Sequence, residues 1–153
     1  MLNQNPSLCA PQISVNYRST SQLKPNSRNP RKHSKKQLDQ LARALLRFGF
    51  IVPVLVNAQD QIVAGHGRIE AAKLAGIEQV PTISVDHLTD AEATAFMIAD
   101  NKLTENAEWN EALLGEHFQE LAALNLDFNL DITGFEVPQI DLLIQGLSPD
   151  TSG

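Results

Sequence analysis

Apolar residues at helical spacing mark the first regular element of this chain. They predict a helix over 35–48, whose apolar stripe consists of Leu38, Leu41, Ala42, Leu45 and Leu46. Ser34, followed three residues later by Gln37, has the sequence pattern of a capping box at the start of this helix. Gly49 is then expected to end it.

Three short apolar runs, at 51–56, 61–64 and 80–85, predict β-strands. The first two are separated by the turn-forming residues 57–60, and this spacing favours a β-hairpin. Pro53 has no backbone N–H, so it is expected near the start of its strand or at a sheet edge.

The second half of the chain is predicted to be helical. Thr89 with Glu92 forms a second capping-box pattern, and Asn110 is a candidate cap for a later helix. The predicted helices cover about 90–104, 111–124 and a last segment that begins near Pro138. In the first of them, the apolar face is expected to consist of Ala91, Ala95, Ile98 and Ala99. Together these elements predict an α+β fold with a small mixed sheet, packed helices and a helical C-terminal part.

The segment around Gly65 carries the most informative pattern. A short apolar strand runs directly into Gly65-His66-Gly67-Arg68, and a helix follows at once and ends at Gly76. The glycines permit positive φ and close approach of a ligand to the backbone. The unpaired N–H groups and the dipole of a helix N-terminus attract anions, and Arg68 adds a planar cation. A phosphate site and an ordinary strand–turn–helix connection are the two interpretations.

Charge is distributed very unevenly along the chain. Residues 1–75 contain 11 of the 12 Lys and Arg and only three acids, a net of +8, whereas residues 76–153 have a net of −14. The basic half suggests an anionic partner such as a nucleotide or DNA. Its candidate DNA-binding residues are Lys35, Lys36, Arg43 and Arg47. A solvated helix surface is the alternative explanation for these four.

Composition limits the kinds of protein and of site that this chain is expected to represent. A single cysteine cannot form an internal disulfide, which favours a cytoplasmic protein. No apolar run approaches the length of a membrane span. His33, His87 and His117 lack the spacing of a zinc site. Residues 1–20 are rich in Asn, Gln, Ser and Pro and are interpreted as a disordered tail, and 147–153 as a second tail.

Three segments together resemble the N-terminal domain of the ParB family, which shares its fold with sulfiredoxin. They are Asn29-Pro30-Arg31 before the capped helix, the passage 48–54 from helix to strand, and the turn 65–68 with Gly76 behind it. The resemblance covers 21–106, with 107–146 as a helical extension. It is nearest to ParB-like domains that precede DNA modification methylases and related phage or plasmid proteins.

The resemblance implies a nucleotide-binding domain. ParB-like proteins bind nucleotide phosphates at this turn, which corresponds here to Gly65, His66, Gly67 and Arg68, with Arg31 as a further contact. The expected nucleotide is CTP or ATP. Asp100 and Asn101 match the family's metal- and phosphate-binding pair and would help to hold Mg²⁺.

The turn departs from the pattern of the partition proteins, which usually have Gly-Glu-Arg-Arg there. One arginine and one carboxylate are missing, which leaves CTP preference and hydrolysis open. Sulfiredoxins have a cysteine where this chain has His66, so a sulfinic-acid reductase is not expected. The Asp-Pro-Pro-Tyr type of methylase motif is absent from the sequence.

Two hypotheses about function follow. The first is a nucleotide-binding module that acts with DNA, either free-standing or as the N-terminal module of a DNA modification or partition-type protein. Its expected partners are DNA, a second copy in a homodimer, and a DNA methylase or a phage or plasmid protein. The second is an enzyme of this fold, a nuclease, NTPase or small-molecule kinase, with His66 and Asp100 as catalytic groups.

Overall fold

The computed structural model describes residues 12–147, so the predictions made for 1–11 and 148–153 lie outside the described residues. Four short strands form one mixed sheet in the order β1-β4-β2-β3. Their bounds are β1 Val15–Ser19, β2 Val54–Val56, β3 Ile62–Ala64 and β4 Gln79–Ser84. β1 and β4 are antiparallel, β4 and β2 parallel, and β2 and β3 antiparallel. The α+β class is confirmed, and so is the hairpin of β2 and β3.

The first predicted strand is shorter than expected. β2 begins at Val54, directly after Pro53, instead of at Ile51. Ile51 and Val52 are exposed, at 75% and 53% of their surface. The apolar run therefore extends beyond the segment that pairs with β4, because only Val54 to Val56 have backbone partners there.

β1 lies in the segment that was interpreted as a disordered tail, and for residues 15–19 that interpretation is wrong. Val15 pairs with Ile83 and Ser19 with Gln79 at the edge of the sheet. Arg18 also donates to Asp60 over 2.6 Å, which ties β1 to the β2–β3 turn. The side chains of β1 are mostly exposed, so its backbone partner on β4, rather than an apolar pattern, fixes this strand.

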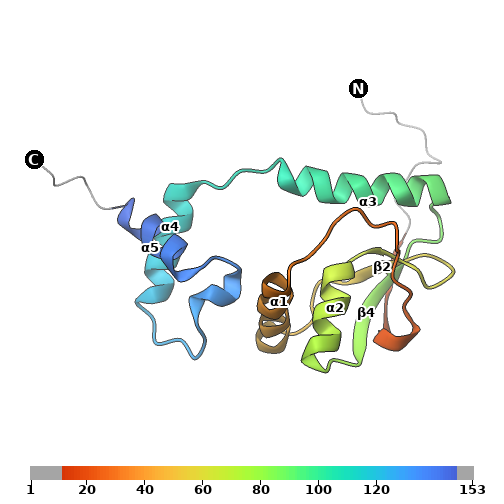
Figure 1. Ribbon diagram of the computed structural model, residues 1–153, viewed down its shortest axis with the longest axis horizontal. Helices are drawn as coiled ribbons and strands as arrows, with labels where there is room; N and C mark the ends of the chain where they lie inside the picture. Colours follow the sequence, from red (N-terminus) through yellow and green to blue (C-terminus); the bar gives the residue numbers. More distant parts are fainter. Residues whose placement is uncertain (1–11, 148–153) are drawn as a thin grey trace, which may run out of the picture.

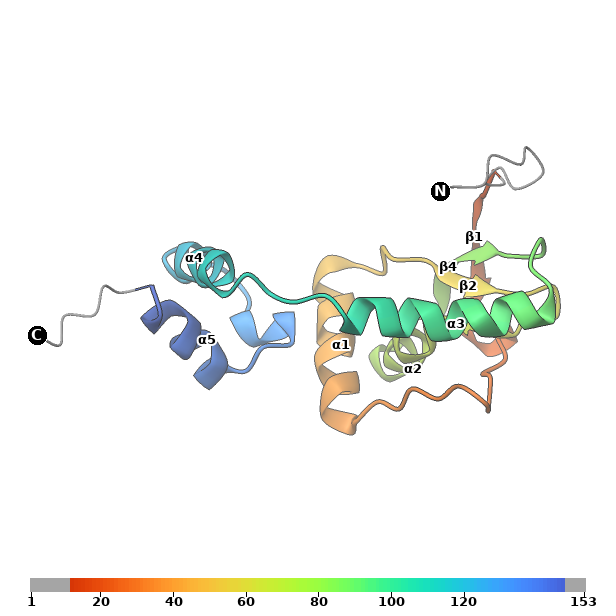
Figure 2. The same ribbon diagram turned by 90° about the horizontal axis from the view of Figure 1, so that it is seen from above.

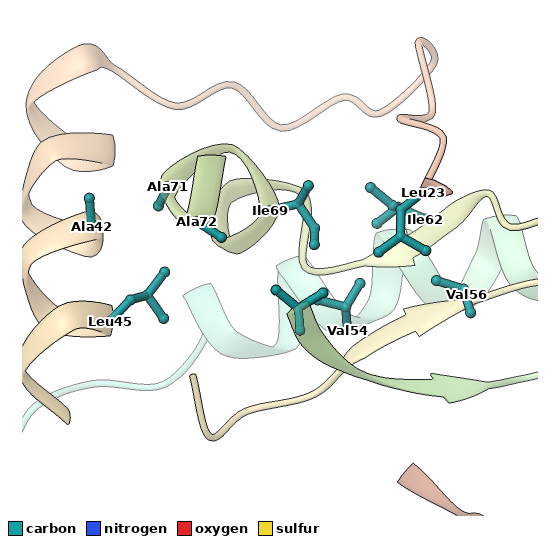
Figure 3. Close-up of a cluster of buried hydrophobic side chains, with 10 residues drawn as sticks. Leu23, Ala42, Leu45, Val54, Val56, Ile62, Ile69, Ala71 and Ala72 are labelled. Carbon is teal, nitrogen blue, oxygen red and sulfur yellow. The ribbon is translucent and has the colours of Figure 1, made fainter. Parts of the chain in front are cut away.

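α2 packs against the sheet, and α1 packs against α2. α1 (Lys35–Phe48) begins with the predicted capping box and ends at Gly49, and α2 (His66–Ala75) ends at Gly76, which has φ 73°. Figure 3 shows Ala42 and Leu45 of α1 pointing toward α2. The buried aliphatic cluster consists of Leu23, Ala42, Leu45, Val54, Val56, Ile62, Ile69, Ala71, Ala72 and Val80. Ile69, Ala71 and Ala72 of this cluster form the buried face of α2.

α3 (Asp90–Glu105) crosses this unit on the side of β3 (Figures 1 and 2). Its capping box is confirmed, but its predicted apolar face is wrong. Ile98 is 53% exposed, and Met97 is the residue that α3 buries. α3 contacts β3 along a narrow strip, so the small residues on its other side face solvent.

The C-terminal elements form a separate small cluster. They are α4 (Glu111–Ala122), the 3₁₀ turn η3 (Leu130–Thr133) and α5 (Val137–Gln145), and Asn110 caps α4 as predicted. Both views place α4 and α5 beyond α1, at the end of the molecule away from β1 (Figures 1 and 2). Phe118 packs edge-on against Phe135, with ring centroids 5.4 Å apart. A second short 3₁₀ helix, η2 (Thr20–Gln22), follows β1.

Candidate functional site

The candidate site is built around the first turn of α2. The hairpin β2–β3 brings the chain to Gly65, the N-cap residue, which has φ 105°. No side chain caps this helix start, and the first intrahelical bond runs from the Ile69 N–H to the Gly65 carbonyl. The N–H groups of residues 66–68 therefore have no partner within the helix and present positive charge.

The two glycines of the turn have different roles. Gly65 takes the positive φ that the sequence suggested, whereas Gly67 lies inside the first helical turn without positive φ. A Cβ on Gly67 would be 2.8 Å from Nε2 of His33. Gly67 is thus required by a close approach, although the approaching group is a side chain of this chain.

Arg68 lies half-buried beside the helix start. Its Nη2 donates to the Pro53 carbonyl over 3.3 Å. Its Nε is buried and has no hydrogen-bond partner among the described residues. Burial lowers the pKa of Arg68, and the carboxylate of Asp100 opposes this shift. The guanidinium is consequently held in place by one contact and retains a donor for a ligand.

Arg31 joins the lead-in segment to α3. Its Nη1 donates to Oδ1 of Asn101 over 2.9 Å, and Nδ2 of Asn101 donates to the Met97 carbonyl over 2.9 Å. The backbone N–H of Arg31 donates to Oδ1 of Asn29 over 3.2 Å. These bonds place a second arginine at the same cavity as Arg68.

His66 is held as a hydrogen-bond acceptor. Its Nε2 accepts from the backbone N–H of Asn26 over 3.3 Å. Burial lowers the pKa of His66 below its ordinary value of 6.5, Glu70 raises it, and His33 lowers it further. The hydrogen bond from Asn26 and the lowered pKa both favour the neutral ring. Its proton is then on Nδ1, because Nε2 supplies the lone pair.

A cavity of about 300 Å³ opens in front of the helix start. Among its lining residues are all seven candidates for phosphate and metal binding: Arg31, Gly65, His66, Gly67, Arg68, Asp100 and Asn101. A neighbouring cavity of about 430 Å³ shares Asn29, Arg31, His33 and His66 with it. The fold thus brings together residues from the lead-in segment, α2 and α3.

The four candidate DNA-binding residues lie elsewhere, on α1. Three of them pair with carboxylates of the C-terminal cluster: Lys36 with Glu136, Arg43 with Asp131 over 3.4 Å, and Arg47 with Asp127 over 2.5 Å. The guanidinium of Arg47 also lies 5.1 Å from the ring centroid of Phe128. Lys35 lines a groove together with Lys36, Arg43, Asp131 and Glu136. This basic surface therefore faces acidic residues of the same chain.

Sequence reasoning missed several residues that line the two cavities, notably His33, Asn26 and Met97. His33 was considered only as a zinc ligand. No local pattern in the sequence indicates its position, because the approach of His33 to Gly67 joins residues 34 positions apart.

Between residues 12 and 147, no three His, Cys, Asp or Glu side chains gather closely enough to hold a metal by themselves. None of the helices in the same range is long and apolar enough to cross a bilayer.

The fold and this cavity define the chain as a ParB/sulfiredoxin-type α+β domain. The family model described as "ParB N-terminal domain" matches residues 10–102, and the chain belongs to that family. The matched residues run from β1 into α3, and they include all seven candidate residues of the site.

Similar proteins agree with this membership. The chain is 38% identical over 80 residues to the ParB-like nuclease domain-containing protein YnaK of Escherichia coli, covering 52% of this chain and 92% of that protein. It is 34% identical over 108 residues to the chromosome-partitioning protein Spo0J of Thermus thermophilus, covering 68% of this chain and 39% of that protein. The chain thus spans well under half of that partition protein.

A solved structure shows the same fold. It is the C-terminally truncated chromosome-partitioning protein ParB from Caulobacter crescentus, complexed with CTP-gamma-S. The TM-score is 0.74 at 24% identity, with 90% of this chain and 81% of that chain covered.

Proposed function

We propose that this ParB-family domain binds a nucleoside triphosphate, CTP or ATP, with its phosphates at the N-terminus of α2. The observation that carries the proposal is the buried Nε of Arg68, which has no partner among the described residues and lies beside uncapped backbone N–H groups. A phosphate oxygen would satisfy these donors. The nucleotide analogue in the Caulobacter ParB structure supports the choice of ligand class.

Each residue of the cavity has a separate role in this proposal. Arg68 and the N–H groups of α2 bind one phosphate, and Arg31 binds another from the lead-in segment. His66 donates from Nδ1 while Nε2 remains bonded to Asn26. Mg²⁺ would be held by Asp100 together with phosphate oxygens, because a hard cation bound to a nucleotide needs few protein ligands. Bound there, it would neutralise phosphate charge.

Asn101 fits a different role from the one that the family resemblance implies. Its Oδ1 already accepts from Arg31, so we assign it to positioning that arginine rather than to Mg²⁺. Asn101→Asp would keep the acceptor, whereas Asn101→Leu would remove it. The first variant should therefore retain more nucleotide affinity than the second.

Isothermal titration with CTP, ATP and GTP in the presence of Mg²⁺ tests the proposal. We expect one nucleotide to bind, and Arg68→Ala to remove binding. Lys73→Ala, a change of another cation at the far end of α2, is the matched control and should leave affinity unchanged. Absence of binding by all three nucleotides at millimolar concentration would disprove the proposal.

We further propose that the domain acts with DNA, because its relatives include chromosome- and plasmid-partitioning proteins. The candidate surface is α1, where Lys35, Lys36, Arg43 and Arg47 lie. Each phosphate contact contributes roughly 0.9 to the slope of log affinity against log salt. Changing Lys35 and Lys36 to Ala should flatten that slope by about 2 at most, measured by fluorescence anisotropy on a labelled duplex. An unchanged slope would exclude both lysines from the interface.

A catalytic role is the second candidate function, and the similarity to a ParB-like nuclease domain-containing protein favours it. His66 and Asp100 line one cavity and would supply the acid–base and metal-binding groups. Plasmid-nicking and phosphate-release assays test it, with His66→Ala and Asp100→Ala as variants. Activity that both variants retain in full would exclude these two residues as its source.

A further inference from the structure

His33 lies against the helix start on which the proposed nucleotide site is built. It follows the lead-in segment and precedes the Ser34 cap of α1, yet its ring reaches α2. The position of a Cβ on Gly67 is 2.8 Å from Nε2 and 2.9 Å from Cε1 of His33. The imidazole therefore occupies the space that any side chain at position 67 would need.

His33 also lines both cavities, so it lies at the boundary between them. It makes no hydrogen bond to a described residue, unlike His66, whose Nε2 accepts from the Asn26 backbone. The two histidines thus differ. His66 has one ring nitrogen in use, whereas both ring nitrogens of His33 remain available as donors when the ring is protonated.

The surroundings of His33 favour an anion. The charged and titratable groups that face the two cavities come from three elements. They are Arg31 and Lys32 on the lead-in segment, His66, Arg68 and Glu70 on α2, and Asp100 on α3. Three permanent cations and the α2 N-terminus outweigh two carboxylates, so a negatively charged group between them is stabilised.

We propose that His33 is a phosphate-binding residue of the nucleotide site and that Gly67 is glycine to admit its ring. This inference rests on the proposed nucleotide binding and adds a specific consequence. A ring N–H of His33 would donate to a phosphate oxygen in the cavity that Arg31 and Arg68 also line. The site accordingly prefers ligands with several phosphate groups.

The test compares His33→Gln with the wild type in full-length protein, with CTP–Mg²⁺ and with inorganic tripolyphosphate as probes. The loss of one hydrogen bond to a phosphate corresponds to a roughly tenfold change in affinity. We expect His33→Gln, which lacks the imidazole ring, to weaken the binding of both probes by about that factor.

Gly67→Ala tests the pairing of the two residues. Its Cβ would displace the His33 ring, so this variant should lose as much affinity as His33→Gln. The double variant should lose no more than either single variant, because residues that act through one contact are not additive. His117→Gln, on α4, is the matched histidine control and should bind as the wild type.

The outcomes separate the two proposals. A wild type that binds neither probe overturns both. A wild type that binds, with the affinity of His33→Gln unchanged, overturns the role of His33 and leaves nucleotide binding intact. Additive losses in the double variant would also overturn the pairing. Circular dichroism melting curves that match the wild type establish that each variant is folded.

Discussion

The sheet with α1 and α2 is held together by buried aliphatic side chains, whereas the α4–α5 cluster meets α1 largely through charged side chains. Val54, Val56 and Val80 are at most 1% exposed in the first region. The contact with the second region includes three ion pairs and the Phe48–Phe128 edge contact, with centroids 5.7 Å apart. Burial of apolar surface is insensitive to salt, but exposed ion pairs are screened. The region that carries the candidate site should therefore stay folded under conditions that release the other.

The largest effect on stability is expected when a buried side chain is truncated in each of the two regions. Ile62→Ala should lower the free energy of unfolding by about 2–5 kcal/mol, because Ile62 is 1% exposed within the main cluster. Ile140→Ala, at a residue 4% exposed in α5, should instead raise hydrogen exchange in α4 and α5 only. Urea unfolding and hydrogen exchange measure the two effects.

The exposed Ile98 supplies the control, since Ile98→Ala should change the unfolding free energy by no more than about 0.5 kcal/mol. If Ile140→Ala destabilised the sheet as much as Ile62→Ala, the two regions would unfold as one unit and the comparison would be wrong.

A smaller effect is expected where α4 and α5 cross. A Cβ on Gly115 would be 2.5 Å from the backbone carbonyl oxygen of Leu143, so neither partner is a movable side chain. Gly115→Ala should force the two helices apart at a cost of about 1–3 kcal/mol to their cluster. Limited proteolysis should then cleave in the C-terminal cluster while α1 and α2 stay protected. Gly146→Ala, whose Cβ would have nearest neighbours at 3.5 Å, is the matched control.

The ion pairs should have a smaller effect still. Each exposed pair contributes roughly 0.2–1 kcal/mol. Changing Asp127 and Asp131 to Asn and Glu136 to Gln should loosen the C-terminal cluster from α1, and the wild type in high salt should behave in the same way. Hydrogen exchange in α1 measures the loosening.

The same triple variant bears on the basic surface of α1. Once Lys36, Arg43 and Arg47 have lost their carboxylate partners, any DNA affinity should rise and depend more steeply on salt. Equal DNA affinity for the wild type and the triple variant would show that these cations do not take part. Glu105→Gln, which alters a pair with Lys102 on α3, is the control for loss of a carboxylate that does not face α1.

The smallest expected effect is the pH dependence of stability that His66 causes. Its pKa in the folded protein is lowered below 6.5, so the unfolded chain binds the proton more readily. Stability consequently rises with pH just below 6.5 and is lost as the pH falls through that window. His66→Gln should flatten this part of the profile in urea unfolding at pH 7.5 and 5.5. An equally steep profile in the variant would assign the dependence to another group.

Helix boundaries were predicted well because the determining interactions are local. The Ser34–Gln37 and Thr89–Glu92 boxes each join residues three positions apart, and both form as expected. The strand–turn–helix at Gly65 is local in the same sense. β1 was missed because its determining partner, β4, lies sixty or more residues away and its own side chains are mostly exposed.

The sequence by itself determined the helices, the hairpin, the anion-attracting helix start and the family resemblance, since each depends on neighbouring residues. Only the tertiary structure decided which face of α3 is buried, that His33 fills the space above Gly67, and that the cations of α1 face Asp127, Asp131 and Glu136. Those arrangements depend on how distant elements pack. A helical face or a charge cluster is compatible with many packings, and only contact with a particular partner selects one.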